Sequence, residues 1–206
     1  MSFRYFIYIS DAKVEMLLQQ IDPGAMRTRS TEVGVDLKVF SGKRGAEKTV
    51  GADRVARLER VVRFLTDFGD LGDVENPGQF FAGTLPLSWG PMVGLDGHPM
   101  VYFGGRSDKT VLGLGGSRAH MFTAPADPGS DAPLSRSLLP SLLRGITAPQ
   151  PGDDEATVLA AVHEATTTLP GPAQRIEFVA KRLVHGTGPG GETVLLGSPL
   201  YLAMAD

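Results

Sequence analysis

The chain has 206 residues, 42% of them hydrophobic, and a formal net charge of −3, so that we predict a single domain over residues 1–206. It contains no cysteine, which excludes disulfides, Cys-ligated zinc, iron–sulfur clusters and thiol catalysis. No apolar run reaches the roughly 20 residues that a membrane-spanning helix needs, and the N-terminal stretch lacks the features of a signal peptide. We therefore predict a cytoplasmic protein without a membrane partner.

The first half of the chain alternates predicted strands and helices. Residues 3–9 are aromatic and β-branched, and because both faces are apolar we predict a central strand of the sheet. Ser10 then offers an N-cap for a helix that ends before the Asp-Pro-Gly turn at 22–24. Residues 31–40 alternate between apolar and polar, as in a half-buried strand. A strongly amphipathic helix is predicted over 53–69.

The middle of the chain reads as three antiparallel strands. The stretch 78–90 alternates, and because Pro86 lies inside it, we predict an edge strand or a bulge. Two short apolar runs, 100–103 and 110–114, flank a polar link and predict a hairpin. These three strands are expected to form an antiparallel meander.

The last part of the chain combines loops, helices and a hairpin. Residues 123–153 are rich in Pro and Gly and predict a surface segment, within which the leucine-rich stretch 134–146 predicts a short helix. A further helix is expected over 153–168. A glycine-rich turn joins the strands predicted at 175–185 and 193–204. The fold class is therefore α+β: a mixed sheet that opens β-α-β-α, then an antiparallel meander, two helices and a C-terminal β-hairpin.

Paired glycines in the central hairpin make the first candidate ligand site. Glycine weakens a strand unless the backbone bends, takes a positive φ or lies very close to another group. The spacing is neither that of a dinucleotide fingerprint nor that of a phosphate-binding P-loop. Two interpretations stay open: backbone N–H groups that bind an anion, or a bent hairpin that packs tightly on a neighbour. The predicted ligand-binding residues are Ser10, Asp11, Lys13, Gly104, Gly105, Gly113, Gly115, Gly116, Ser117, Arg118 and His120.

Catalytic and metal-binding patterns are weak. Ser117 and His120 invite a nucleophile–base interpretation, but the G-x-S-x-G turn is absent because Ala119 stands where the second glycine would be. The four histidines show no metal-ligand spacing. We therefore predict no catalytic residue and no metal site.

Charge is distributed unevenly along the chain. Arginines 54, 57, 60 and 63 recur every three residues of the second predicted helix and form a basic ridge. The ridge either meets phosphates or is a solvated helix face with acidic residues nearby. No aromatic residues interleave it, as single-strand binding requires, so we favour the solvated face and expect no nucleic-acid partner.

Three segments carry a resemblance to a known family. They are Y-F-I-Y-I-S-D-A-K-V-E-M-L at Tyr5–Leu17, Y-F-G-G-x6-L-G-L-G-G-S-x-x-H at Tyr102–His120, and V-L-L-G-S-P-L-Y-L-A at Val194–Ala203. Together they resemble an uncharacterised domain-of-unknown-function family of actinobacteria such as Streptomyces, over essentially the whole chain. The resemblance implies no established activity, cofactor or catalytic residue. Similar domains occur beside bacterial conflict or signalling modules with caspase-like and TPR-containing proteins, which implies a sensor or adaptor.

These observations favour a binding module that recognises a small anionic ligand or a partner protein in a bacterial signalling or conflict system. The first alternative is an enzyme acting on a nucleotide or phosphorylated substrate through Asp11, Lys13 and Arg118. The second is a structural subunit whose leucine-rich segment and terminal hairpin build an oligomer. The sequence indicates no particular cofactor.

Overall fold

The computed structural model describes residues 4–21, 46–93, 98–122 and 155–205. The chain divides into two compact units. The barrel unit consists of Met1–Ser10 and Asp70–Asp206, and the helical unit of Asp11–Gly69. Both helices and strands are present, as an α+β fold requires, whereas one domain over the whole chain stays a prediction. Among the described helices, none has both the length and the apolar character that crossing a bilayer demands.

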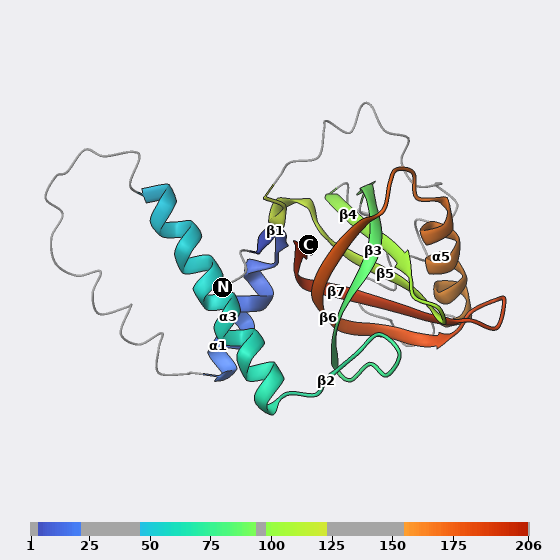
Figure 1. Ribbon diagram of the computed structural model, residues 1–206, viewed down its shortest axis with the longest axis horizontal. Coiled ribbons are helices and arrows are strands. Elements are labelled where there is room, and N and C mark those ends of the chain that lie inside the picture. Colours follow the sequence, from blue (N-terminus) through green and yellow to red (C-terminus); the bar gives the residue numbers. More distant parts are fainter. Residues whose placement is uncertain (1–3, 22–45, 94–97, 123–154, 206) are drawn as a thin grey trace, which may run out of the picture. The chain divides into compact units, whose positions relative to one another are not determined.

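In the described part of the chain, seven strands of the barrel unit form one sheet (Figure 1). A short 3-10 turn, η1, follows the fifth strand, and one helix, α5, precedes the sixth. The bounds are β1 Tyr5–Ile9, β2 Leu71–Gly72, β3 Phe80–Val93, β4 Pro99–Arg106, β5 Thr110–Ser117, η1 Arg118–His120, α5 Glu155–Thr168, β6 Gln174–Thr187 and β7 Thr193–Met204.

Five of these strands close on themselves. β3 pairs with β4, and β4 with β5, in the antiparallel sense that the predicted meander requires. β5 then pairs with β7 in parallel, β7 with β6 in the predicted terminal hairpin, and β6 with β3. Because the last pairing returns to the strand where the order began, the mixed sheet closes into a barrel. No pattern in the sequence predicts this closure.

Alternate residues of the five strands point into the barrel, because side chains on a strand alternate between its two faces. In β6, for example, Ile176, Phe178 and Ala180 face the interior and are fully buried. Aromatic rings meet edge to face there, with the centroids of Phe81 and Phe178 6.0 Å apart. The interior cluster comprises Ile7, Tyr8, Val74, Phe81, Leu87, Val101, Phe103, Leu112, Leu114, Ile176, Phe178, Ala180, Leu195 and Leu202.

Helix α5 covers part of the outer face of the barrel (Figure 1). Its apolar face holds the predicted inward residues Val158, Val162 and Ala165, all of them buried. They pack on outward-facing strand residues, which alternate along each strand with the residues of the interior cluster. Tyr102 is one of these outward-facing residues. The Tyr102 hydroxyl lies 2.9 Å from the Thr166 hydroxyl, which ties β4 to the helix. A buried hydroxyl without a hydrogen-bond partner costs free energy, so this contact favours the observed position of α5 on the barrel.

β1 lies at one end of the strand order, and the prediction of a central strand is wrong. It pairs with β7 along one edge, while its other edge carries, among the described residues, only the bridge between Tyr8 and Met121. Both faces of β1 are nevertheless covered. Ile7 belongs to the interior cluster, and the Phe6 ring contacts Tyr201 on the outside with centroids 5.7 Å apart. Apolar residues on both faces therefore reflect these contacts and not a central position.

β3 is paired on both sides, so the prediction of an edge strand or a bulge at Pro86 is also wrong. Leu87 pairs with Gly105 of β4 and with Gln174 of β6, and no register shift interrupts the described pairs. Pro86 comes one residue before the pairing with β4 begins and pairs only with Arg175 of β6. A proline is tolerated at this point because one side of the strand needs no N–H donor there.

The helical unit contains α1, Asp11–Ile21, and α3, Ala46–Phe68, which pack against each other. The predicted second helix starts at 53, whereas α3 begins at Ala46. Its buried side chains Leu58, Val61 and Leu65 recur at helical spacing, and Gly69 ends the helix by donating its N–H to the Leu65 carbonyl at 3.0 Å. The strand predicted at 31–40, the surface segment 123–153 and the leucine-rich helix 134–146 lie outside the described residues.

Candidate functional site

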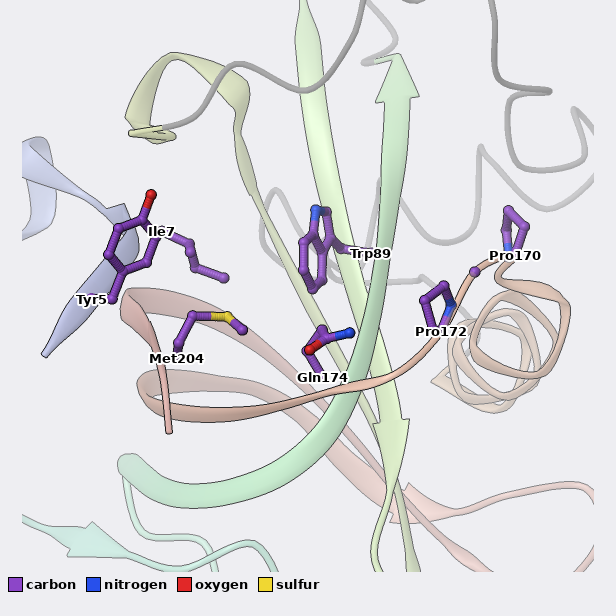
Figure 2. Close-up of a pocket in the computed structure, with 8 residues that line it drawn as sticks. Tyr5, Ile7, Trp89, Pro170, Pro172, Gln174 and Met204 are labelled. Carbon is purple, nitrogen blue, oxygen red and sulfur yellow. The ribbon is translucent and has the colours of Figure 1, made fainter. Parts of the chain in front are cut away.

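The barrel unit contains a hollow of about 500 Å³ beside the interior cluster (Figure 2). Ile7 belongs to both, and Trp89 and Met204 of the lining pack against the cluster. Strands β1, β3, β6 and β7 and the turn between α5 and β6 contribute to it. Its lining consists of Tyr5, Ile7, Trp89, Pro170, Gly171, Pro172, Gln174 and Met204.

Strand register explains why residues so distant in sequence line one hollow. Met204, the last residue of β7, pairs with Tyr5 on one side and with Ile176 on the other. Gln174, two residues earlier in β6, pairs with Leu87 of β3. Trp89 follows Leu87 by two positions and therefore points to the same face of β3. The ends of four neighbouring strands thus meet here.

The chemistry of the lining is apolar and uncharged. Aromatic, thioether and proline side chains predominate, and among the described lining residues only Tyr5 carries an ionisable group. The indole N–H of Trp89 and the carboxamide of Gln174 are polar, and within the described residues neither side chain has a hydrogen-bond partner. The hollow can therefore hold an apolar molecule and offers it two polar groups.

The position of the Trp89 ring is supported by a neighbouring aromatic residue. Its ring packs on Phe103 of the interior cluster, with centroids 6.1 Å apart and planes tilted by 37°. Figure 2 shows Trp89 and Gln174 between Tyr5, Ile7 and Met204 on one side and Pro170 and Pro172 on the other. None of the predicted ligand-binding residues lines this hollow. One signal was present, because the alternation of 78–90 places the single tryptophan of the chain on the same face as buried Leu87.

The glycines of the predicted site lie in β4 and β5 and give space to neighbouring side chains. A methyl group on Gly104 would lie 2.7 Å from Leu169, just beyond α5. A methyl group on Gly116 would overlap the hydroxyl of Tyr8. These contacts support the interpretation in which the hairpin packs tightly on its neighbours.

The remaining glycines also lie in the paired strands. Gly105 pairs with Leu112, Gly113 with Gly104, and Gly115 with Tyr102. The Gly115 carbonyl also accepts a hydrogen bond from the Ser198 hydroxyl at 3.4 Å. Anion binding by backbone N–H groups of this hairpin stays a prediction.

Ser117, Arg118 and His120 form the turn that follows β5. The Ser117 hydroxyl accepts a hydrogen bond from the Ala119 N–H at 3.3 Å and so caps η1. The His120 ring meets the Tyr8 ring edge to face, with centroids 5.8 Å apart. Gly116 and His120 are therefore brought together at Tyr8.

The other predicted residues lie at the start of α1. Ser10 is buried in the barrel unit, and its N–H donates to the Leu200 carbonyl at 2.8 Å. Asp11 and Lys13 belong to the helical unit, where the Asp11 carboxylate accepts a hydrogen bond from Arg54 at 2.6 Å. A pocket shared by these residues and the glycine hairpin stays a prediction.

Two arginines of the basic ridge pair with acidic residues inside the helical unit. Arg54 contacts Asp11, and Arg57 lies 3.1 Å from Glu15 and 3.3 Å from Asp53. Such exposed pairs contribute at most about 1 kcal/mol each. The pairs with Asp11 and Glu15 link α1 to α3, which supports the interpretation of the ridge as a solvated face.

A small polar cluster lies on the outer face of the barrel where β6 and β7 pair. The Tyr201 hydroxyl donates a hydrogen bond to Glu177 at 2.5 Å, and Arg4 lies 3.2 Å from the same carboxylate oxygen. Burial, then the hydrogen bond and charge of Glu177, raise the pKa of Tyr201 well above its ordinary 10.0. Burial likewise raises the pKa of Tyr102, against which the Thr166 contact acts only weakly. Both groups are therefore held as neutral phenols.

We expect the stability of the barrel unit to fall above about pH 10. In the unfolded chain these two tyrosines ionise near 10.0, whereas in the folded protein they keep their protons. The unfolded state then binds fewer protons, and the free energy of unfolding decreases as the pH rises. Urea unfolding on both sides of this pH measures the slope. Tyr102→Phe with Tyr201→Phe should flatten it, and an unchanged slope in that variant would contradict the assignment.

The described residues contain no group of three or more His, Asp or Glu side chains arranged to hold a metal ion. One protein-family model matches residues 4–206, and its description is "Family of unknown function (DUF7019)". No curated protein and no solved structure matches the chain. The resemblance to a family of unknown function is thereby confirmed, while an actinobacterial origin stays a prediction.

Proposed function

The chain belongs to DUF7019, a family of unknown function, and from the geometry of its barrel we propose that it is a binding module that takes up an apolar small molecule. The binding site is the hollow lined by Tyr5, Trp89, Gln174 and Met204. In this proposal the protein is a sensor: it reports the presence of the molecule and does not transform it.

The observation that carries the proposal is an apolar hollow next to a packed core. Its volume of about 500 Å³ lies within the range of small-molecule sites, roughly 300–1,000 Å³. Water in contact with such a lining is displaced favourably by an apolar molecule.

The lining favours binding over catalysis. General acid–base chemistry needs titratable groups that face the reacting atoms, and nucleophilic catalysis needs a nucleophile beside a base. Tyr5 is the only titratable residue in the described part of this lining, and the residue is 63% exposed. These facts support a binding module over the enzyme acting on phosphorylated substrates. A neutral lining also offers no counter-charge to an anion, so an anionic ligand would have to bind elsewhere.

The terminal hairpin bears on the proposal of an oligomer subunit. Much of its outer edges is used within the chain, because residues 174–181 of β6 pair with β3 while β7 pairs with β5 and β1. A sheet edge that is already paired cannot add a strand from a second chain. The barrel therefore supports a ligand-binding function of one chain.

A fluorescence titration tests the proposal. Trp89 is the single tryptophan of the chain and lines the hollow, so its emission reports directly on occupancy. The probe is N-phenyl-1-naphthylamine, an uncharged apolar dye whose emission increases out of water. We expect saturable binding of one dye per chain, with loss of Trp89 emission by energy transfer.

Paired charge variants provide the control. Met204→Glu places a carboxylate at the hollow and should weaken dye binding at least about tenfold, because an unpaired charge resists desolvation. Thr187→Glu adds the same charge at an exposed position of β6 and should leave the affinity unchanged. Dye binding that does not saturate, or that is the same in both variants, would overturn the proposal.

A further inference from the structure

We infer that the hollow selects an uncharged, planar aromatic molecule that carries a carboxamide-like group, with Gln174 as the residue that recognises this group. The inference rests on the proposed function and specifies its ligand. Three properties of the lining lead to it: its neutrality, a fixed aromatic ring, and a polar side chain without a partner.

Charge comes first. Among the residues that the structure describes, no Asp, Glu, Lys, Arg or His lines the hollow. A charged ligand would lose part of its hydration on binding and gain no opposite charge from these residues, which costs free energy that a neutral ligand does not lose. The ligand that complements this lining is therefore neutral.

Shape follows from the aromatic ring. Trp89 packs on Phe103 and is thus held in a defined orientation while lining the hollow. Pro170 and Pro172 on one side, and Ile7 and Met204 on the other, provide stiff or apolar walls around it (Figure 2). Aromatic rings gain contact energy by stacking on such a ring, beyond the area that they bury. A flat ring system fits this arrangement better than a globular aliphatic one.

Polarity is contributed by Gln174. Its carboxamide can donate and accept hydrogen bonds, and in the described part of the chain it makes none to protein. An apolar ligand that covers Gln174 would leave both functions unsatisfied, at a cost of about 1–3 kcal/mol. A ligand amide, lactam or similar donor–acceptor group satisfies them, and the indole N–H of Trp89 offers a second donor. The Gln174 carboxamide thus makes the apolar hollow selective for ligands that carry such a donor–acceptor group.

Isothermal titration calorimetry with three matched compounds tests the inference. The compounds are 2-naphthamide, its charged analogue 2-naphthoate, and the saturated decahydro-2-naphthamide. We expect 2-naphthamide to bind at least about tenfold more tightly than either analogue, because one lacks neutrality and the other lacks the flat ring. Equal or stronger binding of the naphthoate or of the decahydro compound would overturn the inference.

A variant isolates the role of Gln174. Gln174→Leu retains the apolar lining and should weaken 2-naphthamide about tenfold, because the bound carboxamide loses its hydrogen-bonding partner. Unchanged 2-naphthamide affinity in this variant would overturn the inference and leave the proposed function intact. If the dye binds neither protein, the proposed function fails as well. Circular dichroism melting checks that the variant is folded.

Discussion

Gly113→Ala should destabilise the barrel unit by about 3 kcal/mol, since overpacking and a lost buried hydrogen bond both contribute. A methyl group at this position would overlap the Tyr102 hydroxyl and lie 3.0 Å from Val162 of α5. Tyr102 is fully buried and hydrogen-bonded to Thr166, so its side chain cannot move into solvent to relieve the overlap. Denaturant unfolding measures the loss.

Two further variants make this result specific. Gly90→Ala adds the same methyl group to a buried glycine of β3, where it meets only the end of the Leu169 side chain at 3.3 Å, and should cost less than about 1 kcal/mol. Tyr102→Phe removes the overlapping hydroxyl, so in combination with Gly113→Ala the two losses should be less than additive. Additive losses, or a Gly90→Ala variant as unstable as Gly113→Ala, would show that the contact with Tyr102 is not the cause.

Phe81→Ala should cost about 3–5 kcal/mol of stability, the usual loss when a buried aromatic residue leaves a cavity. Phe81 has an exposure of 0%, contacts Phe178, and fills the space that Gly197 leaves on β7. Phe81 belongs to the interior cluster, so its truncation leaves a cavity among side chains that are already packed. Phe122→Ala is the matched control, because that ring is 44% exposed, and should cost less than about 1 kcal/mol. Similar losses in the two variants would mean that the interior cluster does not hold the barrel together.

Local patterns predict the local elements of this protein well. The helical spacing of Leu58, Val61 and Leu65 marks α3, and alternating residues on either side of a short turn mark the hairpins β4–β5 and β6–β7. Closure of the sheet leaves no such pattern. It depends on the parallel pairing of residues 110–114 with 193–197, two segments that no turn joins. The wrong position of β1 has the same origin, because apolar faces reveal burial and not which neighbour provides it.

The candidate site is harder to predict than the fold. The glycine pairs suggest a ligand site in the sequence. In the structure, Gly104, Gly113 and Gly116 instead leave space for the side chains of other residues. The hollow, in contrast, is formed by ordinary apolar residues and one glutamine. Trp89 and Gln174 share a site only through the register of β3 with β6. A linear pattern cannot encode such a constellation before the register is known.

The position of β7 in the barrel has a consequence for synthesis. β7 pairs with β1, β5 and β6 and is the last strand of the barrel in chain order. On the ribosome, β3, β4 and β5 emerge long before it, and until it arrives β5 has no partner on one edge and the apolar interior is open to water. Strands in this condition are prone to pair with other chains, and long-range closure is slow. The nascent barrel is thus most vulnerable to aggregation just before its final strand is released, in the interval when a chaperone has the most exposed surface to bind.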